Sequence, residues 1–221
     1  MAVAASAPPS IIWWRTKPMA RQSTAEDWRV YYQRTGDRPP RETLLDALAR
    51  FEADDAVGRA VDLGCGGGRD TIEMLRRGWS VLGIDGQASA IETLLARPEL
   101  SNFQHQPDTM VSRFELAQWP AADLVNSSFA LPLCPREDFL VMWQRIYDSL
   151  SQGGRFSGQL YGDRDQWVGD DSNTHFTLGE VQDLLRDYEV ELFREEETES
   201  VTPRGTSKHW HIYHIVARKP A

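Results

Sequence analysis

The sequence of 221 residues contains two cysteines, no long apolar run and a shortage of positive charge, and each of these shortages excludes a class of protein. Cys65 and Cys134 lie far apart and neither belongs to a Cys-x-x-Cys pair, so we expect two free thiols and no bound metal. No stretch approaches the roughly 20 apolar residues of a membrane span. The first residues also lack the basic and apolar regions of a secretory signal. These absences predict a cytoplasmic protein without a membrane partner.

The excess of acidic residues argues against nucleic acid as a partner. Lys and Arg together number 24 and Asp and Glu 33, which gives a formal net charge of -9. Affinity for a phosphate backbone depends on clustered basic side chains. We therefore expect a small-molecule partner, and a monomer or homodimer.

The length and the hydrophobic content of 41% suffice for one core, so we expect one domain at 21–221 after a disordered or loosely packed extension at 1–20. Thr24 followed by Glu26 and Asp27 predicts a helix at 24–33, and a stripe of leucines predicts a second helix at 40–51. These two helices would form an N-terminal lid at 21–55 over a core at 56–221.

Apolar and amphipathic segments then alternate along the core. Strands are predicted at 59–63, 80–84, 102–106, 122–126, 154–160, 190–196 and 209–217, and helices at 69–77, 89–96, 136–150 and 178–188. Strict alternation that closes with a hairpin is typical of the α/β class. We expect a Rossmann-like three-layer sandwich, with a mostly parallel sheet and helices on both faces.

A glycine-rich turn, DLGCGGGRD, connects the first predicted core strand directly to a helix. A phosphate-binding loop would need Lys and then Ser or Thr after the last glycine, whereas Gly68 is followed by Arg69. A dinucleotide fingerprint would place a third glycine where Arg69 stands, which weakens an NAD site. The remaining pattern is Asp62, Gly64, Gly66 and Gly68.

Two carboxylates accompany this turn. Asp62 precedes Gly64 and would attract an amino group while repelling a pyrophosphate. Asp85 ends the second predicted core strand, where a carboxylate can accept both hydroxyls of a ribose. Together they predict S-adenosylmethionine as the ligand. Asp85 capping a turn and Asp62 orienting the loop remain structural alternatives.

The segment VDLGCGGGRD followed by VLGID resembles the class I S-adenosylmethionine-dependent methyltransferases. Gly68, Arg69 and Asp70, the aromatic residues of the first helix and the terminal KHWHIYHIVARK are similar to the tellurite-resistance-type branch of that family. The resemblance covers about Trp28 to Lys219. It implies a seven-stranded sheet whose last strand is antiparallel.

The resemblance also implies a set of cofactor-binding positions: Tyr32, Asp62, Gly64, Cys65, Gly66, Asp85, Gly86, Asp108, Thr109 and Asn126. Asp62 and Gly64 would lie near the methionine part, Asp85 at the ribose, Asp108 near the adenine after the third strand, and Asn126 beside the sulfonium. Tyr32 would reach the methionine carboxylate from the lid, or only pack. Because the segment QHQPDTM departs from the usual pattern, Gln106 or Met110 could take part of the role of Asp108, which could also be a plain turn residue.

The acceptor side of the site is less patterned. His175, His209 and Tyr161 are the candidates for a catalytic base, which a phenol or ammonium acceptor would require. Thr206 and Lys208 could line the acceptor pocket beside them.

The hypothesis is therefore a methyltransferase acting on an N, O, S or chalcogen atom of a small molecule. A cofactor-binding regulatory module without turnover is the alternative, followed by an NAD-linked oxidoreductase.

Overall fold

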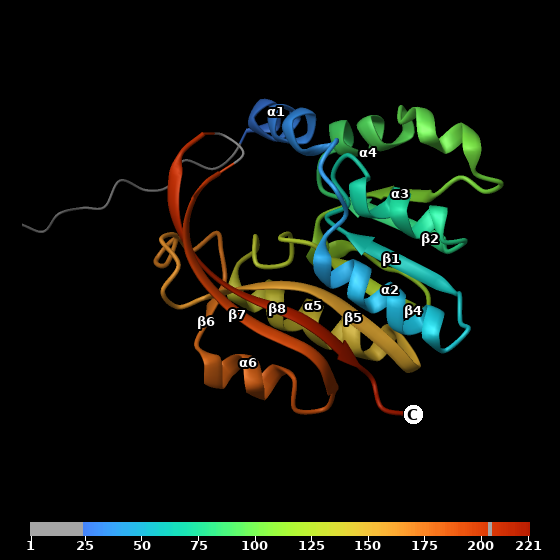
Figure 1. The fold of residues 1–221 in the computed structure, drawn as a ribbon. Helices are drawn as coiled ribbons and strands as arrows, with labels where there is room; N and C mark the ends of the chain where they lie inside the picture. The colour runs from blue at the N-terminus through green and yellow to red at the C-terminus, as the bar shows by residue number, and fades with distance from the viewer. Residues whose placement is uncertain (1–23, 203–204) are drawn as a thin grey trace, which may run out of the picture.

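The computed structural model describes residues 24–202 and 205–221, so the predicted extension at 1–20 lies outside the described residues. One twisted sheet dominates the structure, with the strand order β3-β2-β1-β4-β5-β8-β7 and a short β6 paired with β5 (Figure 1). Strand β8 runs antiparallel to both β5 and β7, whereas the other pairs are parallel. This is the predicted Rossmann-like α/β architecture.

The strands are β1 (Arg59–Leu63), β2 (Ser80–Asp85), β3 (Asp108–Val111), β4 (Ala122–Ser127), β5 (Leu150–Gly162), β6 (His175–Phe176), β7 (Glu189–Val201) and β8 (Ser207–Arg218). The α-helices are α1 (Ala25–Thr35), α2 (Glu42–Ala53), α3 (Arg69–Arg76), α4 (Ala88–Leu95), α5 (Arg136–Ser149) and α6 (Leu178–Leu184), and two short 3-10 helices are η1 (Pro98–Asn102) and η2 (Phe114–Leu116). None of these helices is long and apolar enough to cross a membrane.

Two apolar cores separate the sheet from its helical layers. On one face, Phe139 and Trp143 of α5 and Val181 of α6 pack with Phe156 of β5. On the other face, α2 and α3 cover the sheet around a second cluster that includes Leu48. The two layers bury opposite faces of β1, β4 and β5, so the carboxyl ends of these strands are held at one edge.

The first helix lies apart from both layers, where its neighbour is α4 (Figure 1). It begins with a capping box, in which the Thr24 hydroxyl accepts from the Asp27 amide while the Asp27 carboxylate accepts from the Thr24 amide. The β7–β8 hairpin curves toward the same side of the molecule as α1 (Figure 1). A helix and a hairpin from the two ends of the chain therefore flank the carboxyl edge of the sheet.

One predicted strand is wrong. Residues 102–106 form the end of η1 and a loop, and the third strand is instead β3, which begins at Asp108. The side chains of β3 are exposed or only partly buried, so its sequence lacks the apolar run by which the other strands were predicted. The two-residue β6 was not predicted, and both strands of the closing hairpin extend beyond their predicted bounds.

Candidate active site

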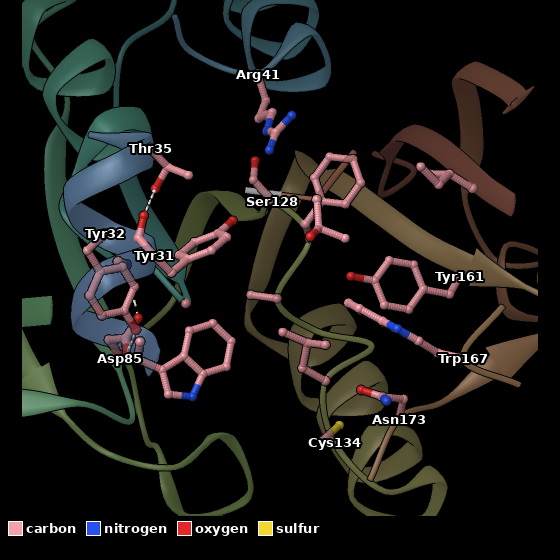
Figure 2. A pocket seen from close by; sticks show the side chains of 18 of the residues that line it. Tyr31, Tyr32, Thr35, Arg41, Asp85, Ser128, Cys134, Tyr161, Trp167 and Asn173 are labelled. Carbon is pink, nitrogen blue, oxygen red and sulfur yellow. Dashed lines mark hydrogen bonds between the residues drawn. The ribbon is translucent and has the colours of Figure 1, made fainter. Parts of the chain in front are cut away.

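A cavity of about 1070 Å³ opens along the carboxyl edge of the sheet. Its walls come from the segments that follow β1 to β4, from α1 and from the β7–β8 hairpin. In Figure 2, Tyr32 and Asp85 lie on one side of this space, and Tyr161 and Trp167 on the other. We call these sides the cofactor half and the acceptor half.

The glycine turn forms the floor of the cofactor half. Gly64 has a φ of 72°, and its amide donates to the carbonyl of Ile84 at 2.7 Å, which connects the turn to β2. A Cβ at Gly64 would lie 2.2 Å from the Cβ of Ala130, so glycine is required by both the backbone angle and the space. Cys65 and Gly66, also predicted as cofactor positions, line the same floor.

Asp85 connects the end of β2 to this turn. Its carboxylate accepts from the amide of Gly66 at 3.0 Å, from the amide of Gln87 at 2.9 Å and from the hydroxyl of Tyr32 at 3.2 Å. Burial raises the pKa of Asp85, although these hydrogen bonds oppose the rise. Asp85 and Gly86 both line the cavity, and their role at a ribose stays a prediction.

Tyr32 brings α1 onto the cofactor half. Its ring lies against Gly66, where a Cβ would be 3.2 Å from the ring, and it stacks on Trp28 with 6.0 Å between centroids. Burial and the nearby Asp85 raise the pKa of Tyr32, so its hydroxyl is a donor at neutral pH. The Tyr32 hydroxyl therefore donates to Asp85, the acid expected to bind the ribose. It does not lie at the predicted position of the methionine carboxylate.

Asp62 lies deeper, at the end of β1. Its carboxylate accepts from the Thr71 hydroxyl at 2.6 Å and from the Asn126 amide at 2.9 Å. Burial and the negative charge of Asp70 raise the pKa of Asp62 to about 7. Asp62 lines the cavity and can therefore be ionised by a ligand that carries positive charge.

Asn126 does not have the predicted position beside a ligand. It is fully buried beneath the cavity, where its amide nitrogen contacts both Asp62 and Asp70 and its oxygen accepts from Ser157 at 2.8 Å. Because its polar atoms are used in this way, Asn126 orients the two acids and does not line the cavity.

Asp108 and Thr109 are also not at the cavity. Asp108 pairs with Leu82 at the beginning of β3, and parallel strands direct their carboxyl ends to the same edge, so Asp108 lies at the opposite end. The two alternatives to Asp108 near the adenine, Gln106 and Met110, do not take its role either. Gln106 donates to the carbonyl of Leu100, and Met110 packs against the core. The residues that line the cavity after β3 are Arg113, Phe114 and Glu115.

Three arginines, Arg38, Arg41 and Arg69, line the cavity near Asp70. The guanidinium of Arg41 lies 4.3 Å from the ring centroid of Phe129, and its buried Nε has no hydrogen-bond partner within the described residues. Figure 2 shows Arg41 directed toward Ser128, whose buried hydroxyl is likewise unpaired there. Arg41 was not predicted as a site residue, and its only signal is a basic side chain in the first turn of the helix predicted at 40–51, directly before the observed start of α2 at Glu42.

The acceptor half is aromatic. Phe129, Tyr161, Trp167 and Trp210 line it, and they come from the segment after β4, from β5, from the loop after β5 and from β8. Phe129 has a φ of 58°, which is a strained backbone angle for a residue with a side chain. Sequence reasoning predicted only Tyr161 of these four, because the other rings come together only in the fold.

The three candidate bases have different positions. Tyr161 is buried in the cavity wall, its hydroxyl points into the space in Figure 2, and burial raises its pKa, so it can donate a hydrogen bond but not remove a proton. His175 lies behind it, with 5.9 Å between the ring centroids, and does not line the cavity. His209 is directed away from the cavity and contacts Glu199 at 2.7 Å and Glu197 at 3.0 Å, because neighbouring side chains of a strand alternate between its faces. Thr206 and Lys208 do line the cavity.

Comparison with known proteins finds similarity to methyltransferases. Residues 60–154 match a family model described as a methyltransferase domain. No curated protein sequence matches the chain at a significant level.

Solved structures of methyltransferases have the same fold. TehB from Haemophilus influenzae is 18% identical with a TM-score of 0.72, and the alignment covers 86% of this chain but 65% of that protein. The 1,6-didemethyltoxoflavin-N1-methyltransferase of Burkholderia thailandensis, solved with S-adenosylhomocysteine, is 19% identical with a TM-score of 0.61 and coverage of 89% and 87%. Phosphoethanolamine N-methyltransferase 2 of Haemonchus contortus, solved with S-adenosylmethionine, is 16% identical with a TM-score of 0.66 and coverage of 91% and 59%. At these identities the likeness establishes the fold.

Proposed function

We propose that the protein transfers a methyl group from S-adenosylmethionine to a small-molecule acceptor. The observation that carries this proposal is the position of Asp85, which is hydrogen-bonded to the amide of Gly66 and borders a cavity whose other half is aromatic. A ribose fits a carboxylate at this edge of the sheet. The match of 60–154 to a methyltransferase-domain model and the neighbours solved with this cofactor or its demethylated product support the choice of ligand.

The residues of the cavity fit the separate parts of this cofactor. Asp85 would accept the ribose hydroxyls after the hydroxyl of Tyr32 leaves its oxygen. Burial and the neighbouring Asp70 raise the pKa of Asp62, and the ammonium group would favour its ionised form. Phe114 offers a ring at the adenine end in place of Asp108.

The chemistry requires little from side chains. The bound cofactor supplies a methyl group already activated on a sulfonium, and the acceptor lone pair forms the new bond as the carbon–sulfur bond breaks. The protein must align the reactants and exclude water. The aromatic walls exclude water, and the Tyr161 hydroxyl can orient the acceptor as a donor. With Tyr161 protonated and His209 outside the cavity, these residues favour an acceptor that reaches the site already deprotonated or needs no deprotonation.

Calorimetry tests the cofactor. We expect heat with S-adenosylhomocysteine and none with NAD, and the reverse pattern would refute the proposal. Incubation with methyl-labelled cofactor and a panel of phenols, carboxylates, thiols, amines and tellurite then tests transfer. The expected result is label on one of these acceptor classes, whereas no transfer to any of them with intact binding would favour a regulatory module.

The expectations about localisation, oligomeric state and nucleic-acid binding rest on the sequence alone. The acidic net charge of -9 and the few cysteines support a cytoplasmic protein, monomeric or dimeric, that does not bind nucleic acid. Size-exclusion chromatography with light scattering tests the oligomeric state, and a gel-shift assay tests nucleic-acid binding.

A further inference from the structure

The acceptor half contains an aromatic cage that is occupied by a side chain of the protein itself. The Nζ atom of Lys208 lies 3.3 Å from the ring centroid of Trp210, 3.5 Å from that of Trp167 and 4.8 Å from that of Tyr161. The three rings are mutual neighbours, with 5.5 to 6.1 Å between centroids. Three aromatic rings around one cationic nitrogen are the arrangement with which proteins bind ammonium ligands.

A carboxylate closes the base of this cage. Asp165 accepts from the Lys208 ammonium at 2.8 Å, and it is fixed in turn by the backbone amide of Trp167 at 2.9 Å. The Lys208 side chain is 2% exposed and that of Asp165 is 0% exposed. Burial lowers the pKa of Lys208 to about 8 while the hydrogen bond to Asp165 opposes the decrease, so the ammonium is largely charged at neutral pH.

This occupancy changes what the cavity can accept. An external ammonium finds the cage filled by the Lys208 ammonium, which is already paired with Asp165. The other cation of the acceptor half, Arg41, has an unpaired Nε and packs on Phe129. Asp165 neutralises Lys208, and Glu196 contacts Arg194 and His214. The other lining acids of this half lie on the loop after Trp167, where Asp170 accepts from the Ser172 hydroxyl and Asp171 is exposed, so Arg41 is the cation of this half that can meet an anionic group.

We propose that Lys208 is a built-in occupant of the cage formed by Tyr161, Trp167 and Trp210, which makes the cavity reject ammonium acceptors and select a planar ring that carries an acidic group. This inference rests on the proposed function, and it deepens that function by naming the acceptor class. The ring would lie against the exposed aromatic surfaces, since aromatic pairs stack favourably in offset or edge-to-face arrangements. Its carboxylate would face Arg41. A carboxylate is already an anion at neutral pH, so methylation of its oxygen needs no base from the protein.

The first experiment uses the unmodified protein saturated with S-adenosylhomocysteine. Two probes share one ring and differ in the sign of their charge: 4-hydroxybenzoate and (4-hydroxyphenyl)trimethylammonium. We expect the anion to bind at least tenfold more tightly by calorimetry. Equal or tighter binding of the cation, or binding of neither probe, overturns the inference and leaves the cofactor proposal intact if S-adenosylhomocysteine itself binds.

The second experiment empties the cage and needs no cofactor, so it decides the inference even if the cofactor proposal fails. Removing the ammonium alone leaves Asp165 buried and unpaired, so the variant is Lys208→Ala combined with Asp165→Asn. We expect this variant to gain at least tenfold in affinity for tetramethylammonium over the unmodified protein, measured by quenching of tryptophan fluorescence. Lys208→Met combined with Asp165→Asn, which fills the cage without charge, is the matched control and should show no gain. An unmodified protein that binds tetramethylammonium as well as the emptied variant would overturn the inference.

Discussion

Replacing Asp85 by Asn tests the cofactor half with almost no change of shape. The carboxylate accepts hydrogen bonds from the amides of Gly66 and Gln87 and from the Tyr32 hydroxyl, and the same oxygens face the cavity. An asparagine keeps one acceptor oxygen and loses the charge. One charge-assisted hydrogen bond to the ribose is worth about 2 kcal/mol. The loss corresponds to a roughly 30-fold increase in the Kd for S-adenosylhomocysteine.

The assay is calorimetry at a temperature at which circular dichroism shows both proteins folded, because the new amide NH₂ opposes a backbone donor and costs some stability. Asp108→Asn is the matched control. It makes the same chemical change at the beginning of β3, level with Leu82 and outside the cavity lining, so its Kd should equal that of the unmodified protein. An Asp85→Asn Kd within twofold of the unmodified value would refute the assignment, and a large effect of Asp108→Asn would restore its predicted role at the adenine.

Three further predictions concern the glycine turn, the first helix and the buried acid. Gly64→Ala adds a strained positive φ and a methyl clash, so it should lower the free energy of unfolding by about 3 kcal/mol, visible as a Tm decrease of roughly 10 °C, while Gly179→Ala, which has open space, should not lower the Tm. Tyr32→Phe removes the hydroxyl that competes for Asp85 and should tighten S-adenosylhomocysteine binding several-fold; weaker binding would mean that the hydroxyl contacts the ligand. The pKa of Asp62 is raised by burial to about 7 in the fold against about 4 unfolded, so its contribution to stability is complete below pH 4 and is lost as the pH rises through 7. The Tm of the unmodified protein should therefore fall relative to that of Asp62→Asn between pH 5 and pH 8, and parallel Tm curves would contradict the raised pKa.

The sequence by itself determined the class of the fold and the cofactor half. The alternation of apolar and amphipathic segments requires a covered parallel sheet, and the glycines of the turn are needed because the chain passes from β1 to α3 through positive φ angles. Asp62 is the penultimate residue of β1, and Asp85 is the last residue of β2. Because β1 and β2 are parallel, strand direction alone places both carboxylates at the carboxyl edge of the sheet. Local patterns suffice for these features because each depends on residues within one β–α unit.

The tertiary structure decided the position of the third strand and the character of the acceptor half. Strand β3 lies at the edge of the sheet with side chains only partly buried, so its sequence lacks the apolar run that marks the buried strands. His209 and Lys208 are adjacent in sequence, yet the pleat of β8 directs the first to surface glutamates and the second into the aromatic cage. The cage combines rings from β5, the loop after β5 and β8, and an arrangement between distant segments has no local pattern that a single sequence could reveal.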